Sequence, residues 1–253
     1  MNKQARLFIS ILTIVGFLFF VIIGCEEDRG APRDEDDVPD GVVVDIEGNS
    51  YETVEIGDQV WMAENLRTTR YNDSTVIPNI TDHDEWDDTD KGAYARYNND
   101  RRNVQSCGFL YNAYTIETQK LCPDGWHVPG DEEWKELEME LGMNRTNADK
   151  VGIKRGIDEG SKLAGNASLW HAGELTNESV FGASGFKGFP GGVRVKSGGF
   201  YSFGFNGCWW TSTVSSSGNV WIRKLRYNSS RVYRNNYHKG YGFSVRCLKD
   251  QAQ

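Results

Sequence analysis

The pattern of apolar and polar residues predicts a β-hairpin and a third short strand at the start of the folded part of the chain. Residues 42–46 are rich in valine and predict a strand, and residues 51–56 alternate as a strand with two different faces does. Gly48 and Asn49 lie between these segments, and such a pair favours a tight hairpin turn. Residues 57–58 turn the chain again, and we expect a strand over 59–62.

The spacing becomes helical after residue 130. Acidic residues 131–133 begin a segment in which Trp134, Leu137 and Leu141 recur three or four residues apart. Negative charge stabilises the first turn of a helix, and the glycine at position 142 favours its end. We therefore predict a helix over 131–141, entered through a Pro-Asp-Gly turn and the short apolar stretch Trp-His-Val.

The C-terminal quarter of the chain is rich in residues that favour strands. Four β-rich segments separated by Gly, Asn and Ser predict an antiparallel meander, at residues 209–214, 220–227, 231–237 and 242–248. Apolar residues would cover one face, and we expect the other face to expose Arg223, Arg226, Arg231 and Arg234.

The middle of the chain shows weaker periodicity. Residues 71–90 are typical of a long surface loop, and 94–97 and 109–114 of short elements with half-buried aromatics. A second helix is predicted within residues 146–162. The glycine-dense stretch 182–199 requires tight turns or close approach of two backbone segments.

Composition and charge narrow the function. A chain of 253 residues with 38% apolar content can bury one substantial core. The net charge of -8 argues against general nucleic-acid binding. Residues 26–100 are rich in acids, whereas Asp250 is the single acid after Tyr201 among many basic residues. These are either two solvated faces or a basic strip for an anionic glycan or a partner.

The N-terminus indicates export and lipidation. Lys3 and Arg6 precede an apolar run that ends in Gly24 and Cys25, and this pattern resembles a bacterial lipoprotein signal peptide with its lipobox. We assign residues 1–24 to the signal peptide, Cys25 to lipidation and residues 25–41 to a flexible acidic tether. A plain membrane-anchor helix is the alternative. Acidic residues 26–28 resemble the export signal of Bacteroidota-type lipoproteins, so we expect an outer-membrane lipoprotein exposed at the cell surface.

The remaining cysteines are even in number, as is typical of disulfides in exported proteins. They are Cys107, Cys122, Cys208 and Cys247. Three connectivities are possible, and we favour Cys122 with Cys247 and Cys107 with Cys208. No close pair of ligands favours zinc.

Several ordered motifs resemble one family. The chain is identified as a member of the Fibrobacter succinogenes major paralogous domain over residues 42–250, with a short tail at 251–253. The resemblance rests on DIEGNSYETVEIGDQVWMAENLR, CGFLYNAYT, LCPDGWHVPGDEEWKEL, GSKLAG, GFKGFPGGVR, CWWTSTV and GFSVRCLKD.

The resemblance implies an exported lipoprotein domain, without a general activity. Its Trp-His-Val-Pro turn and its closing segment also resemble parts of the formylglycine-generating enzymes. That similarity implies an α+β, C-type lectin-like fold with short antiparallel strands, one or two helices and long loops. The pair of reactive cysteines that those oxidases use is not matched here.

Two groups of side chains are candidate ligands. Loop carboxylates are the oxygen donors that calcium prefers, so calcium is a possible cofactor at Asp82, Asp84, Asp87, Asp88 and Asp90. Aromatic rings and hydrogen-bonding groups suit a glycan, and the candidates are Trp210, Tyr227, Arg231, Tyr233 and Arg234. His127 is expected to be a packed, hydrogen-bonded histidine and not a catalytic base.

The sequence thus favours a non-enzymatic surface lipoprotein. Its domain would bind a glycan or a protein, it would contact the membrane through lipid on Cys25, and it would not bind nucleic acid. An extracellular enzyme acting on polysaccharide or protein, and a structural envelope or adhesion component, are the alternatives.

Overall fold

The computed structural model describes residues 39–153 and 155–251, which belong to one compact unit. The predicted signal peptide, the lipidation site Cys25 and residues 26–38 of the predicted tether lie outside the described residues. In the part of the chain that is described, no helix is both long and apolar enough to cross a membrane.

The structure mixes short helices with antiparallel strands, as an α+β protein does. The helices are α1 (His83–Asp88), α2 (Val104–Cys107), α3 (Ala113–Glu117), α4 (Asp131–Glu140), α5 (Arg145–Asp149), α6 (Glu159–Leu163) and α7 (Glu174–Asn177), with 3₁₀ turns η2 (Tyr97–Asn99), η3 (Arg101–Asn103) and η4 (Ala167–Leu169). The strands are β1 (Val42–Val44), β2 (Ser50–Ile56), β3 (Gln59–Met62), β4 (Tyr94–Ala95), β5 (Leu110–Asn112), β6 (Trp126–His127), β7 (Val193–Arg194), β8 (Phe200–Tyr201), β9 (Asn206–Val214), β10 (Val220–Arg226), β11 (Ser229–Tyr237), β12 (Gly242–Phe243) and β13 (Leu248–Lys249).

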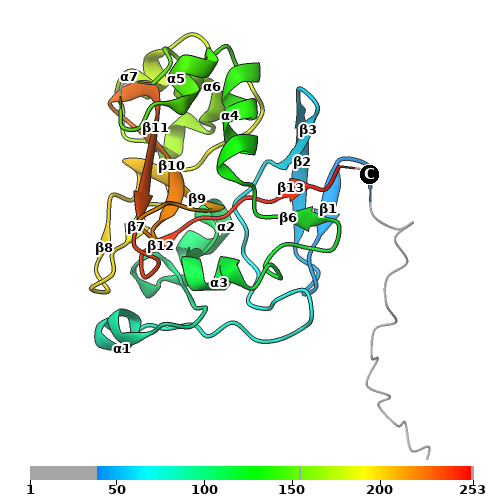
Figure 1. Ribbon diagram of the computed structural model, residues 1–253, viewed down its shortest axis with the longest axis vertical. Helices are drawn as coiled ribbons and strands as arrows, with labels where there is room; N and C mark the ends of the chain where they lie inside the picture. Colours follow the sequence, from blue (N-terminus) through cyan, green and yellow to red (C-terminus); the bar gives the residue numbers. More distant parts are fainter. Residues whose placement is uncertain (1–38, 154, 252–253) are drawn as a thin grey trace, which may run out of the picture. The chain divides into compact units, whose positions relative to one another are not determined.

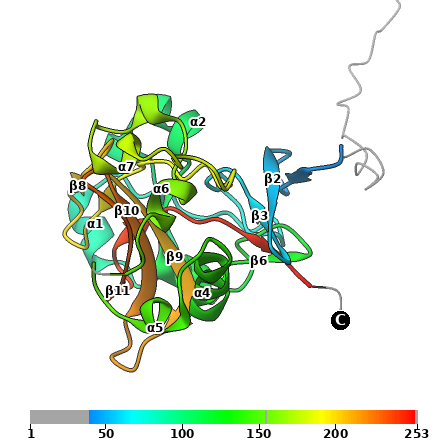
Figure 2. The ribbon, with the colours of Figure 1, turned by 90° about the horizontal axis from the view of Figure 1, so that it is seen from above.

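Within the described residues, the strands form three antiparallel sheets. Their orders are β1-β2-β3-β13-β6, β11-β10-β9 and β4-β5-β12-β7-β8. The first sheet joins the earliest strands to the last one, because Leu248 of β13 pairs with both Trp61 and His127. Helix α4 lies between this sheet and the long strands β9 to β11 (Figures 1 and 2).

Helix α4 forms as the sequence predicts, one residue shorter. The backbone N–H of Gly130 donates to Glu133 Oε2 at 2.6 Å, which holds the entry to the helix. Trp134 and Leu137 are buried, and the helix ends before Gly142, whose φ of +112° favours glycine. The helix therefore presents an apolar stripe to the core.

The core around α4 is a cluster of aromatic side chains. The ring centroids of Trp61 and Trp134 lie 4.9 Å apart, and Phe186 contacts both Trp134 and Trp209. The buried Arg246 of the closing segment lies over the Phe186 ring and donates to the carbonyl of Lys187 at 2.6 Å. The glycine-dense stretch is thereby fastened to the end of the chain.

Three expected elements differ in the structure. The predicted second helix is two short ones, α5 and α6, because the chain between them turns away with Gly152 and Gly156 at positive φ. The 71–90 loop contains α1, which Asp82 caps by accepting from two backbone N–H groups. Segment 242–248 does not continue the meander: β12 pairs with β5 and β7, and β13 with β3 and β6.

The Cys122–Cys247 disulfide is present, with Cα atoms 5.9 Å apart, and it links the turn before β6 to the segment before β13. The Cys107–Cys208 pairing was wrong, and both are buried thiols. The Cys208 side chain lies opposite Lys224 on the face of β9 that packs into the core, whereas Cys107 ends α2. Burial raises the pKa of the Cys208 thiol to about 11, so the thiolate is disfavoured.

Candidate binding site

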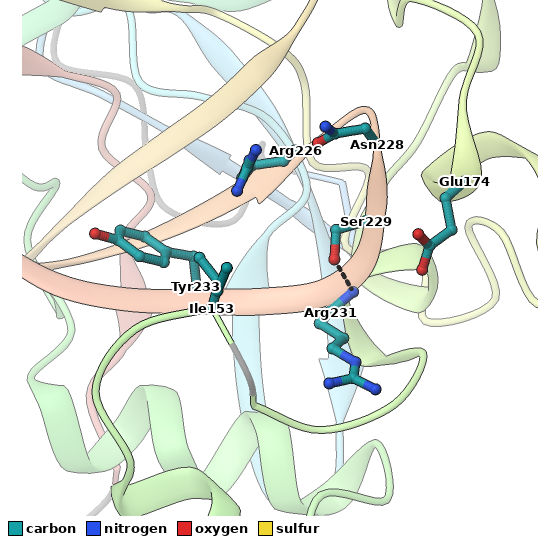
Figure 3. A pocket seen from close by; sticks show the side chains of 7 residues that line it. All are labelled: Ile153, Glu174, Arg226, Asn228, Ser229, Arg231 and Tyr233. Carbon is teal, nitrogen blue, oxygen red and sulfur yellow. Dashed lines mark hydrogen bonds between the residues drawn. The ribbon is translucent and has the colours of Figure 1, made fainter.

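A pocket of about 320 Å³ opens at the tip of the β10–β11 hairpin (Figure 3). Its side chains come from the hairpin, from the loop after α5 and from the start of α7. The lining residues are Ile153, Glu174, Arg226, Asn228, Ser229, Arg231 and Tyr233.

Backbone contacts hold the three segments together. The ladder between β10 and β11 shifts register between Lys224 and Arg226, so that Arg226 pairs with Ser229 across the turn. Glu174 Oε1 accepts from the N–H of Ser230 at 3.2 Å. The N–H of Gly152 donates to the carbonyl of Arg234 at 2.8 Å, which positions the loop that carries Ile153.

The pocket carries a net positive charge, because two arginines and one carboxylate line it. Within the described residues, neither Arg226 nor Arg231 forms an ion pair, and the single carboxylate among the lining residues is that of Glu174. Tyr233 adds a half-buried ring, with Lys224 Nζ 5.0 Å from its centroid. Guanidinium groups bind carboxylates, sulfates and phosphates through paired hydrogen bonds. Acid–base hydrolysis of a glycoside uses two carboxylates, whereas Glu174 is the one that lines this pocket.

The predicted ligand residues divide into three groups. Arg231 and Tyr233 line the pocket, and Tyr227 lies in the turn beside it. Trp210 is fully buried and its indole N–H donates to the carbonyl of Tyr111 at 2.7 Å. Arg234 is buried too, so Trp210 and Arg234 do not face this pocket.

The expectation that four arginines share one exposed face is wrong for Arg223 and Arg234. These two lie opposite each other on β10 and β11, on the face covered by α4. Asp131 of α4 binds both of them, accepting from Arg223 Nη1 at 2.8 Å and from Arg234 Nη2 at 2.6 Å.

Glu138 lies on the same face of α4, seven residues after Asp131, and completes this buried network. Its Oε1 accepts from Arg223 Nε at 2.7 Å and from Arg155 Nη1 at 3.0 Å. Burial raises the pKa of Asp131, but the hydrogen bonds and charges of Arg234 and Arg223 outweigh it, and the pKa lies below its ordinary value. We assign the network a structural role, because each of its three arginines has a buried carboxylate partner.

The predicted calcium residues do not converge. Asp82 caps α1, and Asp87 is paired with Lys196. The other members, Asp84, Asp88 and Asp90, lie in or just after the same short helix. Across residues 39–153 and 155–251 no group of three or more His, Cys, Asp or Glu side chains is placed to hold a metal ion. Calcium binding stays a prediction without a geometric site.

His127 lies between two carboxylates, at the edge of a second pocket of about 370 Å³ near the disulfide. Its Nε2 is 2.8 Å from Glu133 Oε1, and its Nδ1 is 2.6 Å from Asp250 Oδ1. The hydrogen bond to Glu133 raises the pKa of His127 and, with that to Asp250 and against the effect of burial, brings it to about 9. The ring is therefore a cation at neutral pH, which is unsuited to a general base.

Sequence reasoning missed several lining residues. Glu174 and Ile153 lie 46 and 67 residues before Val220, where the hairpin begins, and no motif links them to it. Asn228 and Ser229 were expected only to form the turn. The one usable signal was the basic composition of the last strands, which includes Arg226.

Fold and site together define an α+β domain with a basic pocket at a hairpin tip. The model of the Fibrobacter succinogenes major domain matches residues 54–249, and the chain belongs to that family. Neither the curated proteins nor the solved structures contain a match.

Proposed function

We propose that this protein is a non-enzymatic surface lipoprotein whose domain binds an acidic glycan in the pocket at the β10–β11 tip. One observation carries the proposal: Arg226 and Arg231 border one pocket with Tyr233, and within the described residues both lack an acidic partner. An acidic sugar supplies the missing carboxylate or sulfate and a ring that packs on tyrosine.

The setting of the domain is part of the proposal. The lipobox at Cys25 and the acidic tether support a position at the outer face of the outer membrane, which is part of what we propose. We also propose that the domain belongs to the C-type lectin-like folds. The pairing of β13 with β3, which brings the first and last strands into one sheet, supports this assignment.

A glycan array tests the function. The chain from Glu26 onward is applied to neutral, uronate-containing and sulfated glycans, once with calcium and once with EDTA. We expect binding to acidic glycans, unchanged by EDTA if the arginines bind the ligand directly. Preference for neutral glycans would contradict the proposal, and an empty array would favour a protein ligand.

Paired variants locate the site. Replacing Arg226 and Arg231 by Gln removes charged hydrogen bonds of about 1.5 to 3 kcal/mol each, so affinity falls more than about tenfold. Arg101→Gln, an exposed arginine on η3, is the matched control and should bind as the wild type does. If the variant that lacks Arg226 and Arg231 binds as tightly as the wild type, the pocket is not the binding site.

A further inference from the structure

Three aromatic rings gather at the surface beside the same hairpin turn. His171 and Phe205 stack with centroids 4.7 Å apart at an interplanar angle of 20°. The Tyr227 ring meets both edge-on, at 5.1 Å from His171 and 5.2 Å from Phe205. We call His171, Phe205 and Tyr227 the aromatic platform.

The platform is not part of the core. Phe205 is 40% exposed, His171 is exposed and Tyr227 is half-buried, with its inner side against the cluster around α4. Exposed apolar rings cost free energy in water unless they cover something or bind something. Core packing therefore accounts for one side of Tyr227 and leaves the outward faces of the platform unexplained.

Backbone hydrogen bonds hold the platform in place. The N–H of Tyr227 donates to the carbonyl of Phe205 at 2.9 Å, and the N–H of His171 to the carbonyl of Gly204 at 2.7 Å. A side chain at Gly173 would lie 2.3 Å from the carbonyl oxygen of Tyr227, so only glycine allows this approach. A surface that is fixed before binding loses little entropy when a ligand arrives.

The platform adjoins the basic pocket along the chain. Tyr227 stands between Arg226 and Asn228, which both line the pocket. His171 precedes the lining residue Glu174 by three positions, and the N–H of Leu175 donates to the carbonyl of Tyr227 at 3.0 Å. The same turn and the same segment thus carry both surfaces.

We propose that the platform is a second subsite, which stacks a neutral sugar ring next to the acidic sugar held by the pocket. The apolar C–H face of a pyranose packs on aromatic rings, and it needs no charge there. The ligand is then an oligosaccharide that alternates or mixes acidic and neutral units. This inference rests on the proposed function, because it needs an acidic unit in the pocket.

Calorimetry with two probes tests the subsite. The chain from Glu26 onward is titrated with glucuronate and with a tetrasaccharide of alternating glucuronate and N-acetylglucosamine. We expect the tetrasaccharide to bind at least about tenfold more tightly. Phe205→Ser should lower tetrasaccharide affinity about tenfold and leave glucuronate affinity unchanged, which also shows that the pocket is still folded.

The control is Tyr201→Ser, an exposed aromatic on β8 that is 58% accessible and outside the platform. It should bind both probes as the wild type does. If glucuronate binds and Phe205→Ser binds the tetrasaccharide unchanged, the subsite is wrong and the pocket remains. If neither probe binds to the wild type, the acidic-glycan function itself fails.

Discussion

Two pairs of arginines on the same hairpin have opposite surroundings. Arg223 and Arg234 lie in the middle of β10 and β11 and are buried against α4, whereas Arg226 and Arg231 lie at the tip. The inner pair meets Asp131 and Glu138, which project from one face of α4 because they are seven residues apart. The tip extends past that face, and its neighbouring Glu174 accepts from Ser230.

The difference shows that the partner, and not the residue type, decides what an arginine does. A buried guanidinium is tolerated only where carboxylates and hydrogen bonds compensate for the lost water. An arginine that stays in water needs no such partner, and it remains available to an anion from outside. The inner pair therefore fixes the fold, and the outer pair carries the proposed binding.

The largest expected effect is a difference in stability between two Arg→Gln variants, one in the buried pair and one at the hairpin tip. Arg234→Gln leaves Asp131 without two of its hydrogen bonds and should cost about 3 to 5 kcal/mol of unfolding free energy. Arg231→Gln, three residues earlier on β11, should change stability by less than about 0.5 kcal/mol. Urea denaturation of both variants measures the difference, and similar losses would refute the distinction.

A smaller effect should appear when salt is varied. Binding of the acidic tetrasaccharide should weaken several-fold between about 0.05 and 0.5 M NaCl, because exposed charges are screened. The stability loss caused by Arg234→Gln should be nearly the same at both concentrations, because water and ions do not reach a network in which Glu138 is fully buried. A binding constant that does not change with NaCl concentration would show that Arg226 and Arg231 do not contact the ligand.

The sequence predicted local structure well where one pattern dominated. Strand β2 and helix α4 follow from alternation and helical spacing, and the Cys122–Cys247 link is one of the two pairs in the favoured connectivity. The three strands β9 to β11 were expected as a meander and form one.

The sequence could not predict that both faces of that meander are buried. Basic residues on a strand favour a solvated face, yet Arg223 is as fully buried as its neighbour Ile222. Asp131 and Glu138 reverse this expectation from 85 to 103 residues away, and no local pattern connects them to Arg223 and Arg234. The site was hidden for the same reason, since Glu174 and Ile153 reach it only through the tertiary fold.

The smallest effect concerns His127, which is intermediate between the two pairs of arginines. It has two carboxylate partners, yet 38% of its side chain is accessible. Because its folded pKa of about 9 lies above the unfolded value near 6.5, the stabilisation is complete below about pH 6.5 and is lost as the pH rises through about 9. Screening at a partly exposed site reduces its size to about 1 kcal/mol.

Denaturation of the wild type and of His127→Gln between pH 6 and 9.5 measures this contribution. The wild type should be more stable at pH 6, and the two curves should converge toward pH 9.5, because the neutral imidazole no longer attracts Glu133 and Asp250. A constant difference across the range would mean that His127 stabilises the turn by packing alone. In that case a paired charge matters to this fold only where, as at Arg234, it is sealed from water.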